Sequence, residues 1–235
     1  MKPLHLSYIL LLSFSIVQLS GCGSAPKKKP PAEKKYTPSK KIPVKVVPRR
    51  TVVPFNPMNL SNAAIERTRH KVKYDGKYVK LRYPMGDVPQ NIGVCTDVVV
   101  RAYRRMGIDL QRNVHEDMKR RFALYPSQRI YGKLIPDANI DHRRVVNLEK
   151  YFELHGQKLP LSMNGADYKP GDLVTWRING VAPHIGIVVN KRSKDGQRPM
   201  IVHNDGKGPV TEDILFRMKK MVGHYRYWPT RNRNR

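Results

Sequence analysis

The stretch Gly93-Val94-Cys95-Thr96-Asp97-Val98-Val99-Val100-Arg101-Ala102-Tyr103-Arg104-Arg105-Met106-Gly107 decides how the rest of this chain is interpreted. Its apolar side chains recur at intervals of three and four residues, which predicts an amphipathic helix ended by Gly107. Cys95 falls at the first helical turn, where free backbone N–H groups and the helix dipole stabilise an anion. We expect this position to lower the pKa of the thiol, which makes Cys95 a candidate nucleophile. A buried, structural cysteine fits the same helix.

Residues 1–21 have the composition of an export signal. A short positive start precedes an apolar run that is too short to span a bilayer and ends in small residues. The segment resembles a bacterial lipoprotein signal, because Leu19-Ser20-Gly21-Cys22 fits the lipobox. The resemblance implies that Cys22 carries lipid and becomes the mature N-terminus, which leaves Cys95 as a lone thiol. It also implies a protein lipid-anchored in the cell envelope, at the outer membrane facing the periplasm if the cell has two membranes, because Gly23 follows the cysteine.

Residues 22–57 are rich in Lys and Pro and are expected to form a tether. Such a segment buries little apolar surface, repels itself and reaches on the order of 100 Å. The formal net charge of the whole chain, +27, indicates contact with anionic surfaces such as lipid or cell-wall polymer. We expect no specific nucleic-acid partner. The domain is expected to be exported, and the basic–aromatic run at residues 225–228 also fits a final strand.

Residues 58–235 are expected to form one domain that begins with helices. Besides the helix at Cys95, the pattern predicts a short helix capped by Ser61, another capped by Asn113, and a third over residues 145–154. The charged residues 136–144 are expected to form a solvated loop held by its own ion pairs.

The last third of the chain changes to short β-rich runs separated by turn residues. They cover residues 172–176, 184–189, 200–203 and 225–228. Helices followed by an antiparallel sheet predict an α+β fold. Lys194-Asp195-Gly196 is a hairpin turn signal, with His184 roughly ten residues before it and His203 roughly eight after it, so the two histidines are expected near one open end of the hairpin.

A thiol at a helix start, a histidine on one strand and a polar group on the next are the parts of a cysteine hydrolase. Cys95 would attack a carbonyl carbon, and His184 would take and return the proton. His203, or Asn204 beside it, would hold the imidazole in the useful tautomer. The backbone N–H of Cys95 and a neighbouring amide would stabilise the oxyanion. This chemistry needs no cofactor and no metal.

Several motifs carry a family resemblance over roughly residues 73–229. The sequence resembles the NlpC-type cell-wall cysteine hydrolases of the papain-like superfamily, and most closely a branch described as a domain of unknown function. The resemblance implies a papain-like fold, peptidoglycan as the substrate, and the roles already given to Cys95, His184 and His203. Asp172 belongs to a strand entry in that family and is left out of the catalytic set. The motifs are Gly93-Val94-Cys95-Thr96-Asp97-Val98-Val99, Gly107-Ile108-Asp109-Leu110, Lys169-Pro170-Gly171-Asp172-Leu173-Val174, His184-Ile185-Gly186-Ile187-Val188-Val189 and Ile201-Val202-His203-Asn204.

Two departures from the family pattern fall where a substrate would bind. Val94 precedes the cysteine and Thr96-Asp97 follow it, where most such enzymes have Asp-Cys-Ser-Gly. A long segment rich in Arg and Asp separates the Gly107 turn from the first predicted strand. These departures leave open which amide is cut, in the stem peptide or between peptide and sugar, and no substrate-binding residue can be assigned.

Two other functions fit parts of the sequence. His184, His203 and Asp205 could hold a metal in a metal-dependent hydrolase with a structural Cys95, although their spacing matches no ligand signature. A non-catalytic lipoprotein that binds the cell wall or another polyanion would explain the charge. The order of Cys95, His184 and His203 favours the cysteine hydrolase.

Overall fold

The computed structural model describes residues 55–218 and 220–229, which lie in one compact unit. The predicted signal peptide, the lipidation at Cys22 and nearly all of the tether lie outside the described residues. Among the helices within them, none has the length and apolar character needed to cross a membrane.

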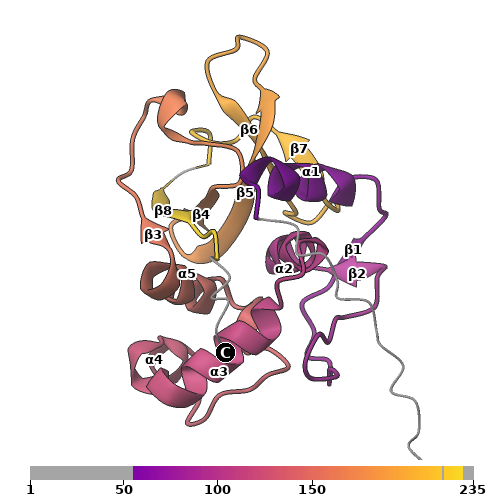
Figure 1. Ribbon diagram of the computed structural model, residues 1–235, viewed down its shortest axis with the longest axis vertical. Helices are drawn as coiled ribbons and strands as arrows, with labels where there is room; N and C mark the ends of the chain where they lie inside the picture. The colour runs from indigo at the N-terminus through magenta and orange to yellow at the C-terminus, as the bar shows by residue number, and fades with distance from the viewer. Residues whose placement is uncertain (1–54, 219, 230–235) are drawn as a thin grey trace, which may run out of the picture. The chain divides into compact units, whose positions relative to one another are not determined.

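The described residues form helices first and an antiparallel sheet afterwards, which confirms the predicted α+β class (Figure 1). The sheet has the strand order β3-β8-β4-β5-β6-β7, and a separate pair, β1 and β2, is parallel. The helices are α1 (Pro57–Arg67), α2 (Cys95–Arg105), α3 (Leu110–Arg121), α4 (Ser127–Tyr131) and α5 (Val145–His155), with short 3₁₀ turns η1 (Phe122–Leu124), η2 (Asp141–Arg143) and η3 (Gly165–Asp167). The strands are β1 (Lys73–Tyr74), β2 (Ile92–Gly93), β3 (Gln157–Lys158), β4 (Leu173–Ile178), β5 (Ala182–Arg192), β6 (Pro199–His203), β7 (Val210–Glu212) and β8 (Met221–Arg226).

The sheet is covered on both faces, because alternate residues of its central strands enter two different apolar clusters. Ile185, Ile187 and Val189 of β5 join the larger cluster, which the helices α1, α2, α3 and α5 complete. Val188 lies in the smaller cluster with Val174 and Trp176 of β4 and with Leu215. The larger cluster fixes α2 against β5, and so fixes the first turn of α2 against the strands that carry the histidines.

Two helices begin earlier than the sequence pattern predicts. Asn56, not Ser61, caps the first helix through its side-chain oxygen, and Pro57 occupies the first turn, where its missing N–H costs nothing. Asp109, not Asn113, caps α3. Phe55, which the sequence analysis assigns to the tether, packs against Tyr103 with ring centroids 6.3 Å apart.

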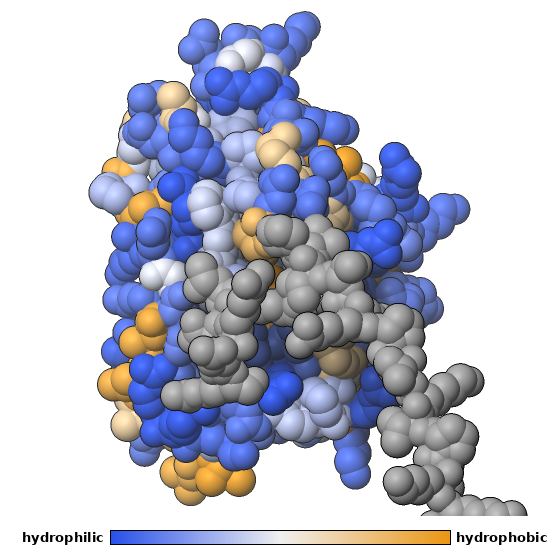
Figure 2. All heavy atoms as spheres, in the orientation of Figure 1, coloured by the Kyte–Doolittle hydropathy of each residue, from blue (hydrophilic) through white to orange (hydrophobic). Residues whose placement is uncertain are grey.

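The surface of the described residues is mostly hydrophilic in the view of Figure 2, with separate apolar areas between hydrophilic side chains. The most exposed large apolar side chains, Leu134, Ile135, Met163 and Val181, lie outside the helices and strands. Scattered apolar residues of this kind are ordinary on protein surfaces.

Candidate active site

Cys95 is the first residue of α2, as the sequence predicts, and Val94 separates it from β2. Its side chain is only 4% exposed. The backbone N–H groups of Cys95 and Thr96 point toward the sulfur, and so does the N–H of Ile185 from β5. The thiol therefore lies against the strand that carries His184.

The histidines predicted to share one end of a hairpin do so. β5 and β6 pair antiparallel, and the Nε2 atom of His184 lies 3.0 Å from the Nδ1 atom of His203. His184 is 2% exposed and His203 is fully buried. Gly186 permits this close approach, since a Cβ atom there would lie 2.4 Å from Cγ2 of Ile201 and 3.3 Å from Cβ of His203.

Of the two candidates for the third group, only His203 is hydrogen-bonded to His184. Asn204 points elsewhere: its Nδ2 atom donates to the carbonyl of Gly93 at 3.3 Å. Its Oδ1 atom accepts from the backbone N–H groups of Gly206 and Gly208, each at 3.1 Å. Asn204 therefore shapes the loop after β6 and ties that loop to β2.

Sequence reasoning missed one member of this cluster, Glu212 on β7. Its Oε2 atom lies 3.1 Å from Nε2 of His203, so a chain of hydrogen bonds runs from His184 through His203 to Glu212. β7 has only three residues, so its sequence carries no periodic signal. The only indication of Glu212 in the sequence would have been the alternation of side chains along β6 and along the short strand that follows it.

The pKa of the Cys95 thiol is raised to about 11, which corrects the expectation that the helix start lowers it. Burial is the main cause, and the carboxylate of Asp97 adds to it, while the three backbone N–H groups act in the opposite direction. Burial also lowers the pKa of His184 to about 4, and His203 lowers it further. At neutral pH the resting site therefore holds a neutral thiol and a neutral imidazole.

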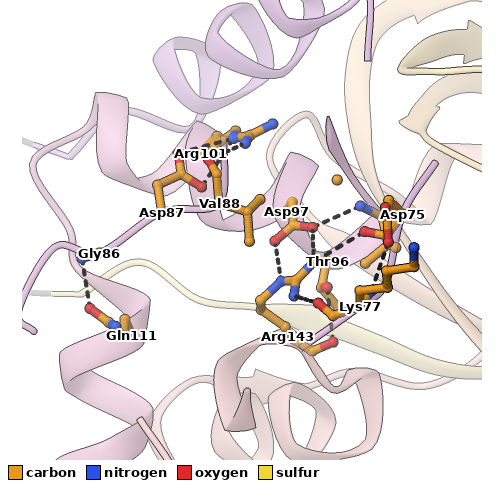
Figure 3. A network of polar contacts seen from close by, with 12 residues as sticks. Asp75, Lys77, Gly86, Asp87, Val88, Thr96, Asp97, Arg101, Gln111 and Arg143 are labelled. Atoms are coloured by element: carbon orange, nitrogen blue, oxygen red, sulfur yellow. Dashed lines mark hydrogen bonds and ion pairs between the residues drawn. The ribbon is translucent and has the colours of Figure 1, made fainter. Parts of the chain in front are cut away.

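The first turn of α2 is anchored by a buried ion pair (Figure 3). Asp97 accepts from the backbone N–H of Val94 at 2.7 Å and from Arg143 at 2.9 and 3.0 Å. Arg143 also donates to the carbonyls of Lys77 at 3.1 Å and Asp75 at 3.4 Å. The turn η2 is thus joined to helix α2 and to the loop after β1.

These contacts contradict the prediction of a solvated loop at residues 136–144. Asp141, His142 and Arg143 are all buried. Arg143 pairs outside the loop, with Asp97, and the hydroxyl of Thr96 donates to the carbonyl of Arg143 at 3.0 Å. The segment that follows the Gly107 turn therefore holds the first turn of α2 in place through Arg143.

Tyr74 lies beside the site, on β1, which pairs with β2 directly before Cys95. Burial raises the pKa of its phenol to about 12, and the negative charges of Cys95, Asp97 and Asp205 raise it further. Tyr74 is 42% exposed and Asp205 is exposed, so both can meet a ligand that approaches the thiol.

The alternative metal site finds no geometric support in the described part of the chain. No group of three or more His, Cys, Asp or Glu side chains within residues 55–218 and 220–229 is arranged to hold a metal ion. Asp172 lies in a separate, structural cluster, where it accepts from His224 at 2.9 Å and from Arg226 at 2.7 and 2.8 Å.

Two surface cavities lie away from this cluster. One of about 680 Å³ is lined by residues of η1, α4 and α5, and one of about 650 Å³ by residues around Tyr83 and α3. Neither is lined by Cys95, His184 or His203. The Cys95 side chain is 4% exposed, so only a small part of it meets solvent in this structure.

Comparison with known proteins gives one family match and one relative with high identity. The family model described as Domain of unknown function (DUF1287) matches residues 61–227. A protein of Escherichia coli (strain K12), named uncharacterized protein YijF, is 47% identical over 169 residues, which cover 72% of this chain and 80% of that protein.

Similarity to solved structures is weaker. NlpC1 from Trichomonas vaginalis is 17% identical with a TM-score of 0.40, over 74% of this chain and 45% of that protein, so this chain spans just under half of its length. An N-acetylmuramoyl-L-alanine amidase from Bacteroides uniformis ATCC 8492 is 13% identical with a TM-score of 0.39, over 72% of this chain and 96% of that protein.

Proposed function

Since this chain belongs to the DUF1287 family, a domain of unknown function, its activity has to be argued from its own residues, and we propose that it is a thiol-dependent amidase or peptidase that cleaves an amide bond in peptidoglycan. Cys95 is the nucleophile, His184 the base and His203 the group that orients it. The sequence features of the first 57 residues support a cell-envelope protein, anchored by lipid at Cys22 and tethered by a basic segment.

The observation that carries this proposal is the placement of His184, which is hydrogen-bonded to His203 and belongs to the strand that contacts the Cys95 thiol. Its Nε2 atom lies 3.0 Å from Nδ1 of His203, and the backbone N–H of the next residue, Ile185, is directed at the sulfur of Cys95. A thiol against the strand that carries a histidine, with a polar group hydrogen-bonded to that histidine, supplies the parts that nucleophilic catalysis by cysteine requires.

The chemical steps follow from this placement. The sulfur of Cys95 adds to the carbonyl carbon of the amide as its proton passes to His184. The N–H groups of Cys95 and Thr96 can stabilise the oxyanion that forms. His184 then gives the proton to the leaving amine as the C–N bond breaks, which leaves a thioester. Water, deprotonated by His184, hydrolyses the thioester and restores the thiol.

The direct test is digestion of purified peptidoglycan by the full chain in detergent, with released fragments identified by mass spectrometry. We expect fragments from the parent protein and none above background from Cys95→Ala or His184→Ala. His70→Ala is the matched control. It changes an exposed histidine just after the end of α1 and should keep full activity. Equal digestion by the parent and Cys95→Ala would refute the thiol mechanism.

One observation favours a second function, a non-catalytic lipoprotein that binds cell wall. The thiol is covered and neutral, as expected for a cysteine that does no chemistry. In that case the parent and Cys95→Ala would both bind peptidoglycan and neither would release fragments.

A further inference from the structure

We propose that Glu212 is a positioning residue that sets the tautomers of both histidines, so that the nitrogen of His184 that remains free is the one that accepts the thiol proton. The inference deepens the proposed function, because it adds a fourth member to the same site. Neither the family resemblance nor the sequence pattern assigns a role to this glutamate.

The geometry begins at β7. Glu212 pairs with Ile201 of β6, and His203 lies two residues further on the same face of that strand. Diagonal neighbours of this kind are within reach of long side chains. Oε2 of Glu212 lies 3.1 Å from Nε2 of His203, and Nδ1 of His203 lies 3.0 Å from Nε2 of His184.

A carboxylate accepts hydrogen bonds but donates none, so the nitrogen facing Glu212 must carry the proton. A neutral His203 protonated at Nε2 has a lone pair at Nδ1, which can only accept. His184 must therefore donate from Nε2, and its Nδ1 atom is left unprotonated. In this way one carboxylate on β7 fixes the protonation of two rings.

Because both rings are buried, these hydrogen bonds have few alternatives. His184 is 2% exposed and His203 is fully buried, so water has little room to supply alternative partners. The planes of the two rings are inclined at 84° to one another, and Nε2 of His184 lies within hydrogen-bond distance of Nδ1 of His203. The Glu212 side chain itself is 42% exposed, so its replacement removes less buried surface than replacement of either histidine would.

Charged and titratable groups face these rings from several elements. Asp205 acts on His184 from the loop after β6, and Glu212 contacts His203 from β7. When His184 takes the thiol proton, the positive charge spreads over the hydrogen-bonded pair, and the carboxylate of Glu212 stabilises it. Without Glu212, His203 is free to turn its protonated nitrogen toward His184, which would place the other proton on the nitrogen needed as the base.

The test is a measurement of histidine tautomers by ¹⁵N NMR on the full chain at neutral pH. We expect protonated Nε2 and unprotonated Nδ1 on both His184 and His203 of the parent protein. In Glu212→Leu we expect Nδ1-protonated forms to appear on both rings. Glu212→Gln keeps an oxygen that accepts from His203 and should retain the parent tautomers in larger part.

Glu153→Leu is the matched control, because Glu153 on α5 is a partly exposed glutamate like Glu212 and is also paired with basic side chains. It should leave both tautomers unchanged. Parent-like tautomers in Glu212→Leu would overturn the proposal, whatever the effect on activity.

Digestion of peptidoglycan gives a second readout. We expect Glu212→Leu to lower kcat about tenfold or more with little change in KM, within the range that general acid–base catalysis contributes. If no variant and no parent protein releases fragments, the proposed function fails, while the NMR result still decides the role of Glu212.

Discussion

At the scale of single residues, the site is governed by desolvation. The helix start and three N–H groups stabilise a thiolate at Cys95, yet burial outweighs them and raises the pKa of the thiol to about 11. The pKa of His184 is lowered to about 4 for the same reason. In the proposed mechanism, the proton therefore moves from Cys95 to His184 during the attack, since both groups are neutral at rest.

This protonation state predicts how the thiol reacts with iodoacetamide. In the full chain with Cys22→Ser, Cys95 is the only cysteine. We expect the alkylation rate to rise about tenfold per pH unit between about pH 7 and pH 10, because only the thiolate reacts. A rate that is already constant between pH 5 and pH 8 would instead indicate a preformed thiolate–imidazolium pair.

His142 predicts a second pH effect, on stability. Burial lowers its pKa to about 3, and the positive charges of Arg143 and Arg104 lower it further, while Asp109 and Asp87 raise it. The unfolded chain binds this proton near pH 6.5 and the native state does not, so the free energy of unfolding falls as the pH drops from about 6.5 to about 3.

The measurement is the pH dependence of unfolding by denaturant. In His142→Gln the slope between pH 4 and pH 6 should be smaller by about 1.4 kcal/mol per pH unit, the contribution of one proton. Asp141 has the opposite effect, because burial raises its pKa to about 6, but it is present in both proteins and cancels. An unchanged slope would mean that native His142 takes up the proton.

At the scale of elements, the turn η2 and the helix α2 act as one unit. The Asp97–Arg143 pair joins them, and both side chains are nearly inaccessible to solvent. Breaking a buried pair leaves one uncompensated charge, which costs far more than losing an exposed pair.

Arg143→Met therefore tests the support of the nucleophile helix. We expect it to lower the free energy of unfolding by about 3–5 kcal/mol, and the double variant with Asp97→Leu to recover part of this loss. Lys150→Met removes a largely exposed pair with Glu153 and should cost about 1 kcal/mol or less. Equal losses in Arg143→Met and Lys150→Met would show that the buried pair does not hold the element.

Helices and hairpins that are specified by a local sequence pattern could be predicted. The 3.6-residue period and Gly107 gave α2, and the turn at residues 194–196 brought His184 and His203 to one end of the β5–β6 hairpin. The predicted starts of α1 and α3 were wrong, because each helix has one capping residue before it and a second residue of capping type a few positions later. Arg143 was placed in solvent because its partner, Asp97, lies 46 residues away, which no local pattern reveals.

At the scale of the whole molecule, charge dominates. The net charge of +27 predicts that the full chain of Cys95→Ala, which cannot digest its ligand by the proposed mechanism, binds isolated cell-wall fragments by electrostatic attraction. Bound protein should fall steeply as salt rises from about 0.05 M to about 0.5 M, because screening shortens the reach of surface charges. Retention that is independent of salt would point to a specific, non-electrostatic binding site.

The burial of Cys95 also governs how the protein meets oxidants. Peroxides attack thiolates, so a covered and protonated sulfur forms sulfenic acid slowly, and it is shielded from mixed disulfides with other thiols. At the proposed location outside the reducing cytoplasm, where a lone reactive cysteine would soon be oxidised, this burial would preserve the thiol. The burial that limits access to the sulfur therefore also limits its oxidation.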